Sequence, residues 1–420
     1  MIERRPDLEA GTLLRPQPIG LFDGPAALLL VPDGDGAQEL LAELARGSVP
    51  AEWPPAAAAL AATRRGDVAD ALAALGDGPV DRVNRFVLAP TPEHLAAARA
   101  AAAGDARLGT VVAAAAFASG LSDDLPDADG LDGEFAALAL TVTASQALSD
   151  RDFFSVIEHL RAAAEHASGV GPALHGRQLA TLGEHMEQIW GPTDELARVY
   201  GEAVQRLTPT AFDEQRAHLQ LQLAMVDHQL ATSDPSARHR LLDAIRSYQS
   251  ALIVLSEERD ADSFALANMN VALAILALPM TQASDQVRLG VAVQSLRAAL
   301  RVYDREQAPQ EWSACQLNLA NALQYLPSRH REDNLGEAVN IYEQLLDFRS
   351  PESDPMGYAR VLANQANALA HLGGFDHALE KYAAARQLFE RSGDRDAVRV
   401  VQEQIAQIGT RRAELGGQPS

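Results

Sequence analysis

Glutamate and histidine stand side by side at four places in the sequence, and both residue types can bind metal ions. The Glu-His pairs lie at 93–94, 158–159, 165–166 and 184–185. Metal sites in helical bundles use Glu and His three residues apart, a spacing that places both side chains on one helical face. Adjacent residues of a helix point about 100° apart instead. His159 and His166 are a heptad apart and could share a face, but we interpret the pairs as exposed helix surface and predict no metal site.

Two glycine-containing segments have the spacing of ligand-binding loops. Gly171 and Gly176 are spaced like the glycines of a phosphate-binding loop, but the lysine and the Ser/Thr that such a loop requires are missing. Asp33-Gly34-Asp35-Gly36 precedes a predicted helix, whose free N–H groups could hold an anion. Its two carboxylates would repel a phosphate. We interpret both segments as turns at helix ends and predict no cofactor.

Nucleophilic chemistry has little support in the sequence. Cys315 is the single cysteine, and it lies in a predicted helix at a repeat position where other units have Val361 or Ala267. We therefore expect a buried, small apolar side chain and no disulfide. Residues 1–120 contain one histidine, His94, and neither cysteine nor lysine, which leaves few groups for acid–base or nucleophilic catalysis. The chain is predicted not to be an enzyme.

The charge balance narrows the classes of partner. With 57 acidic and 35 basic residues the formal net charge is −22, which argues against binding nucleic acid or an anionic membrane through a broad basic face. No uninterrupted apolar stretch is long enough to span a bilayer, and no signal-peptide core follows the two N-terminal arginines. We expect a cytoplasmic protein.

One short pattern, alanine followed four residues later by tyrosine or leucine, recurs through most of the chain. Intact copies and two degenerate ones follow each other in one frame: Ala244–Tyr248, Ala292–Leu296, Ala338–Tyr342, Ala378–Tyr382, Leu196–Tyr200 and Val156–Leu160. Residues four apart share a helical face, so the small residue lets a neighbouring helix approach and the bulky one fills the space one turn further on. The pattern predicts helical hairpins that must stack on one another to cover their apolar faces.

These hairpins resemble the tetratricopeptide repeat (TPR) family. The unit 359–389 carries the family signature at nine positions: Asn364, Ala366, Ala368, Leu369, Gly373, Phe375, Ala378, Tyr382 and Ala385. The resemblance covers about residues 133–391, with repeats longer than the usual length of about 34 residues. The sequence of the repeat unit that precedes 359–389 is similar to the long-period repeats often joined to CHAT peptidase domains, although no such domain is predicted here. The resemblance implies an all-α superhelix of TPR-like helical hairpins.

Outside the array the sequence suggests four further segments. Residues 1–50 are predicted as a small α/β segment in which a turn at 23–25 joins the two strands of a β-hairpin, followed by a helix at 37–46. Residues 51–120 are predicted as Ala-rich helical hairpins, 121–133 as an acidic linker, 134–410 as the TPR-like superhelix and 411–420 as a flexible tail.

The TPR resemblance also implies where a partner would bind. In this family the inner helices line a concave groove, so we expect a protein or peptide partner to contact Asn321, Gln324, Tyr325, Arg360, Asn367 and His371. The alternative interpretation of the asparagines is hydrogen bonding between helices. TPR proteins that clamp a chaperone's terminal carboxylate have a lysine four residues before such an asparagine, and here Leu317 and Ala363 stand there.

Two functions remain open from the sequence. The first is a non-catalytic adaptor or assembly factor that binds a protein segment in the groove. The second is a regulatory sensor that binds a peptide or small ligand and controls a peptidase, NTPase or transcription factor encoded nearby.

Overall fold

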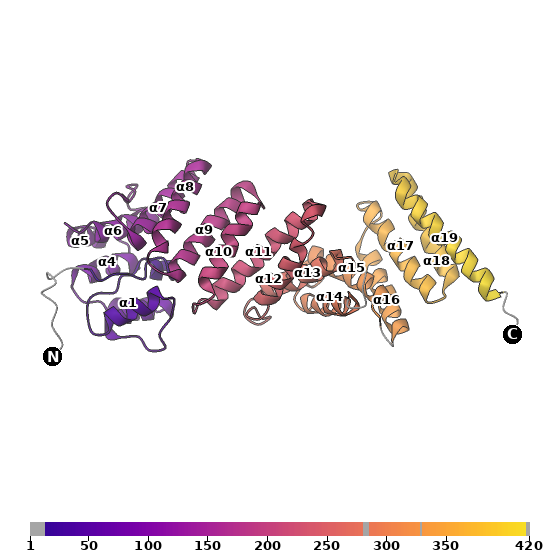
Figure 1. Ribbon diagram of the computed structural model, residues 1–420, viewed down its shortest axis with the longest axis horizontal. Helices are drawn as coiled ribbons and strands as arrows, with labels where there is room; N and C mark the ends of the chain where they lie inside the picture. Colours follow the sequence, from indigo (N-terminus) through magenta and orange to yellow (C-terminus); the bar gives the residue numbers. More distant parts are fainter. Residues whose placement is uncertain (1–12, 280–284, 328–329, 417–420) are drawn as a thin grey trace. The chain divides into compact units, whose positions relative to one another are not determined.

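The computed structural model describes residues 13–279, 285–327 and 330–416, and within these ranges the regular secondary structure consists of helices joined by turns and loops (Figure 1). Nineteen α-helices and three short 3₁₀-helices account for its regular structure, with no strand in the described residues.

By internal contacts the chain divides into two compact units, Met1–Leu230 and Ala231–Ser420. The expected array from 134 to 410 is therefore distributed over both units.

The first unit begins with short helices and continues with longer ones that pack in consecutive pairs. Its elements are η1 (Gly24–Leu28), α1 (Ala37–Ala45), η2 (Pro55–Ala57), α2 (Ala58–Arg64), α3 (Val68–Ala73), α4 (Pro79–Leu88), α5 (Pro92–Ala101), α6 (Ala106–Ala118), α7 (Gly133–Ser149), α8 (Phe153–Ser168), α9 (Pro172–Trp190), α10 (Asp194–Leu207) and α11 (Asp213–Ser233). Helices α7 and α8, and likewise α9 and α10, form antiparallel hairpins because only short turns join them.

The second unit consists of further pairs and a final single helix. Its elements are η3 (Pro235–Ala237), α12 (Arg240–Ala251), α13 (Ala261–Ala277), α14 (Asp285–Ala299), α15 (Pro309–Tyr325), α16 (Arg331–Phe348), α17 (Pro355–His371), α18 (Phe375–Ser392) and α19 (Arg395–Gly416). Pairs form between α13 and α14, α15 and α16, and α17 and α18. The expected all-α arrangement of consecutive helical hairpins is confirmed.

The repeated pattern marks the packed face of the second helix in each pair. Ala244, Ala292, Ala338 and Ala378 are all completely buried. The bulky residues one turn later are buried as well, and in the degenerate copies so are Leu196–Tyr200 and Val156–Leu160. Burial of every member in one frame is the packing that the sequence pattern predicts.

Local sequence fixes where these helices begin and end. Asp152, Thr193 and Asp354 each accept a hydrogen bond from a backbone N–H in the first turn of α8, α10 and α17, which satisfies a donor that has no partner within the helix. Gly373 ends α17 with φ of +82°, a left-handed conformation that glycine adopts without strain. Short capped turns of this kind bring the paired helices together.

The predicted β-hairpin at residues 19–31 is wrong. Gly24–Leu28 forms the 3₁₀-helix η1, which Pro25 favours because its fixed φ suits a first helical position. The backbone of Leu30 and Val31, after this 3₁₀-helix, forms hydrogen bonds with two side-chain amides instead of with a second strand. Asn84 of α4 bonds both the N–H and the C=O of Leu30 at 2.9 and 2.7 Å, and Gln17 does the same for Val31 at 2.8 and 3.1 Å.

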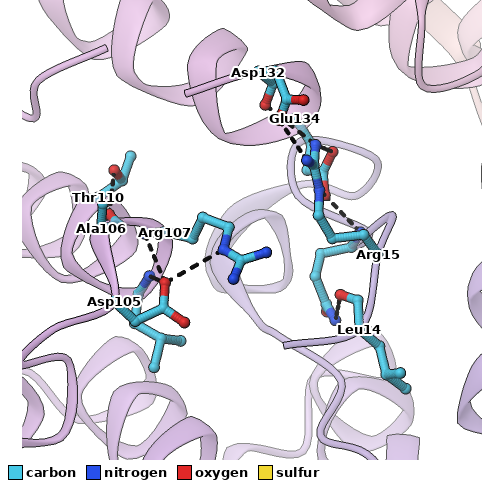
Figure 2. A network of polar contacts seen from close by, with 10 residues as sticks. Leu14, Arg15, Asp105, Ala106, Arg107, Thr110, Asp132 and Glu134 are labelled. Atoms are coloured by element: carbon cyan, nitrogen blue, oxygen red, sulfur yellow. Dashed lines mark hydrogen bonds and ion pairs between the residues drawn. The ribbon is translucent and has the colours of Figure 1, made fainter. Parts of the chain in front are cut away.

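A buried ion pair ties the N-terminal segment to α7, as Figure 2 shows. Arg15 donates through Nε and Nη2 to the two oxygens of Glu134 at 3.1 and 2.9 Å, and it also contacts Asp132. The Glu134 side chain is completely buried and accepts a third hydrogen bond from the N–H of Gln17. Both hydrogen bonding and the nearby carboxylates raise the pKa of Arg15. The segment 121–133, expected as an acidic linker, is therefore held near its end by the contacts of Arg15 with Asp132 and Glu134.

The last helix is longer than expected. The flexible tail was predicted to begin at residue 411, but α19 continues through Gly416, and residues 417–420 lie outside the described residues. Val401 and Ile408, seven residues apart, are buried on one face of this helix. α19 therefore packs against α18 and α17 as the final helix of the unit.

Candidate partner-binding groove

A surface groove runs over the odd-numbered helices of the second unit. Helix α15 contacts α17, and α17 contacts α19, so these three helices form one face of the unit. The groove between them has a volume of about 480 Å³. It is lined by Tyr325, Asn367, Ala370, His371, Gln404, Gln407, Ile408, Thr410 and Arg411. We call it the α15–α17–α19 groove.

Tyr325 is the aromatic side chain of this groove. It is the last residue of α15 and is 66% exposed. Among the described residues of the second unit, no other aromatic residue is so exposed. His371, at the equivalent position of α17, is half-buried beside it. The groove therefore combines an open aromatic surface with polar groups.

Amide side chains connect α15 directly to α17, and those of α15 also bond a buried tyrosine of α16. The hydroxyl group of Tyr342 donates to Asn321 Oδ1 at 2.6 Å and accepts from Gln324 Nε2 at 2.5 Å. Asn364 Nδ2 donates to Asn321 Oδ1, and Asn367 Nδ2 donates to Gln324 Oε1, each at 2.9 Å. Two amide–amide hydrogen bonds thus join α15 and α17, and Tyr342 bonds the α15 member of each. Burial raises the pKa of the Tyr342 hydroxyl group.

The six predicted contact residues therefore have different surroundings. Tyr325 and His371 line the groove. Asn321 and Gln324 bond within the interhelical network, and Asn367 does both. Arg360 is exposed on α17, seven residues before Asn367 and hence on the same helical face. The alternative interpretation of the asparagines, hydrogen bonding between helices, describes the observed bonds of Asn321 and Asn364.

Sequence reasoning missed the contribution of α19. Gln404, Gln407 and Arg411 line the groove, but α19 lacks the alanine–tyrosine pattern that marked the other repeats. The predicted superhelix, 134–410, already included most of this helix, but none of its residues was among the predicted contacts. The apolar period of Val401 and Ile408 is the signal that could have shown which face of α19 packs against the unit.

Two arginines act electrostatically on His371, one of the residues that line the groove. Burial lowers the pKa of His371, and the charges of Arg331 and Arg411 lower it further. Arg331 is the first residue of α16 and Arg411 lies in α19. A positive potential at this histidine is notable because the chain as a whole carries a formal charge of −22.

The structure also places the residues that the sequence singled out for metal, thiol and phosphate chemistry. No three His, Cys, Asp or Glu side chains among them come together as a metal-binding group. Cys315 is completely buried and burial raises the pKa of its thiol to about 12, so the thiol stays protonated and unreactive. Gly176, in the segment with phosphate-loop spacing, lies inside α9 rather than in a loop.

A helix can span a membrane only if it is long and apolar enough. Within the described ranges, none of the helices is both long and apolar enough to pass through a bilayer.

Comparisons with known proteins add one structural similarity. No family model matches the sequence, and no curated protein matches it. Among solved structures, the crystal structure of the P58(IPK) TPR domain is similar at 12% sequence identity, covering 84% of this chain and 97% of that chain, with a TM-score of 0.28. A TM-score of 0.28 does not establish a shared fold. The helix pairs described above show that the protein is an all-α protein of helical hairpins.

Proposed function

We propose that this chain is a non-catalytic binding protein that holds a segment of a protein partner in the α15–α17–α19 groove. Tyr325, Asn367 and His371 would contact the partner directly, and Arg360 would extend the surface along α17. Asn321 and Gln324 would act through the network that fixes the spacing of α15 and α17.

The observation that carries this proposal is the exposure of Tyr325. Exposed tyrosines are enriched among the residues that dominate binding energy, because one rigid ring offers apolar area and a hydroxyl at low entropic cost. Next to this ring, Asn367 donates one hydrogen bond to Gln324, and no described residue donates to its Oδ1. A backbone N–H of a partner segment could fill that position.

Site-specific photo-crosslinking in the native host tests the proposal. The photoreactive residue p-benzoylphenylalanine replaces Tyr325 in the full chain, and the crosslinked partner segment is identified by mass spectrometry. The matched control carries the same residue at Ile253, which is 84% exposed in the same unit but outside the groove. We expect one defined segment at position 325 and none at 253. Equal labelling at both positions, or none at 325, would contradict the proposal.

A further inference from the structure

The lining of the α15–α17–α19 groove differs in charge from the rest of the chain. The chain has 57 acidic and 35 basic residues, yet none of the nine described lining residues carries a carboxylate. Arg411 supplies a positive charge and His371 a group that can become positive. On a strongly acidic protein, this local reversal of charge distinguishes the groove from its surroundings.

The two arginines that act on His371 are available to a ligand. Neither Arg331 nor Arg411 forms an ion pair with a described residue. On the same helix as Arg411, by contrast, Arg399 pairs with Asp396 and Glu403, and Arg412 pairs with Asp376. Arg331 and Arg411 are also both exposed, so their guanidinium groups are open to a ligand.

The acidic residues that follow Arg331 do not neutralise the groove from within. Glu332 and Asp333 line a different surface depression, together with Gln316 and Glu337. Two residues that line the groove are therefore basic, His371 of α17 and Arg411 of α19, and the charge of Arg331, at the start of α16, acts on His371.

Guanidinium groups recognise anionic oxygens well, since their planar donors match carboxylate and phosphate geometry. We propose that the partner segment brings an anionic side chain, a carboxylate or a phosphate, to Arg331, His371 and Arg411. This inference rests on the function proposed above and specifies the chemistry of the partner: an aromatic-binding part near Tyr325 and an anionic residue beside it.

Arrays of short random peptide pools test this chemistry. Each pool fixes one position as Asp, Asn, Arg or phosphoserine, and the full-length protein is applied as wild type, as the double variant Arg331→Gln/Arg411→Gln, as Arg399→Gln and as Tyr325→Ala. Arg399→Gln is the matched control because it removes a paired arginine from the same helix.

We expect the wild type to prefer Asp or phosphoserine pools over Asn pools by up to about fivefold, the range of exposed ion pairs. The double variant should lose this preference and Arg399→Gln should keep it. The ratio of Asp to phosphoserine binding identifies the anion. A preference that persists in the double variant overturns the inference. Capture that depends on Tyr325 but not on charge overturns it too, while leaving the proposed function intact. Capture that is the same for Tyr325→Ala as for the wild type contradicts both.

Discussion

The hydroxyl group of Tyr342 joins α16 to α15 through two hydrogen bonds. It accepts from Gln324 and donates to Asn321, and each of these amides also bonds an asparagine of α17. Burial of polar groups is tolerated when each has a partner, and removing one member leaves its partners unsatisfied. Tyr342 is completely buried, so water has poor access to replace the lost hydroxyl.

Tyr342→Phe should therefore lower the free energy of unfolding by about 1–3 kcal/mol. Tyr382→Phe is the control: Tyr382 occupies the same repeat position and is also buried, but no described residue bonds its hydroxyl. Urea denaturation of both variants measures the difference. Equal losses in the two variants would show that the network contributes little.

The lowered pKa of His371 makes stability depend on pH. Its pKa in the folded state lies below the ordinary value of 6.5, because burial and two nearby arginines disfavour the charged form. Below 6.5 the unfolded chain binds a proton more readily than the folded chain, so stability is lost as pH falls from there through the folded-state pKa. Above 6.5 this residue has no such effect.

His371→Gln should consequently lose less stability than the parent protein between about pH 7.5 and about pH 5.5. Burial also lowers the pKa of His175 and His228, so only the difference between the two proteins is informative. His377→Gln, at an exposed histidine of the neighbouring helix, serves as the control. If the urea midpoints of His371→Gln and the parent shift equally with pH, this assignment is incorrect.

At the scale of single residues, the sequence predicted on which helical turn each polar side chain lies, but not which group that side chain bonds. The repeat frame placed Asn321, Gln324, Tyr325, Asn367 and His371 on equivalent turns of α15 and α17. It could not tell whether an amide faces a neighbouring helix or a partner, because both uses need the same residue type at nearly the same angle. The bond from Tyr342, which lies 21 residues beyond Asn321, gives Asn321 an interhelical use, and it has no local signal in the sequence.

At the scale of helix pairs, a small residue must lie at each close approach, but it need not lie on the same helix. In α16 this small residue is Ala338, and in α18 it is Ala378; both are completely buried. In the pair α9–α10 the alanine is replaced by Leu196, and glycines of α9 provide the space: a Cβ at Gly183 would overlap the ring of Tyr200, and one at Gly176 would meet Leu207. This exchange explains why the degenerate copy still packs.

Ala378→Leu should overpack the pair α17–α18 and lower the unfolding free energy by about 1–3 kcal/mol. Ala378 is completely buried, and α17 has no glycine in its interior beyond its first turn to make room. Ala292→Leu should behave alike, since it occupies the same frame in α14. Calorimetric melting measures both; if neither variant melts below the parent, the packing frame is wrong.

Gly183→Ala should be destabilising although alanine is the better helix former. The added Cβ would clash with the buried ring of Tyr200, at a cost of about 1–3 kcal/mol. Gly201→Ala, on α10, is the matched comparison: its Cβ would meet nothing within 4 Å, so about 0.5–1 kcal/mol of stabilisation is expected. Chemical denaturation of the pair should give shifts of opposite sign, and shifts of the same sign would contradict the packing.

Helices with a repeated apolar frame could be predicted, whereas elements held by long-range polar contacts could not. The segment 19–31 has the apolar residues and the turn of a hairpin, but its backbone is satisfied by Asn84 and Gln17 instead of a second strand. Asn84 is 54 residues from its partner, and nothing in the local sequence indicates that bond.

At the scale of the whole molecule, two compact units carry different features. The first unit contains the segment tied down by Arg15 and Glu134, and the second contains the α15–α17–α19 groove. No sequence boundary predicted the division at residue 230, because it falls inside α11, where composition and helical pattern do not change. The proposed function is accordingly assigned to the second unit by its side chains and not by the order of segments.

The central claim is that groove side chains bind a partner while the amide network beneath them maintains the fold. Tyr325→Ala tests it most directly when the affinity for the segment identified by crosslinking and the melting temperature are measured on the same sample. Because Tyr325 is exposed and truncation of an anchoring aromatic typically costs more than about 1.4 kcal/mol, we predict at least about tenfold weaker binding with an unchanged melting temperature. Binding as tight as that of the parent protein would contradict the account.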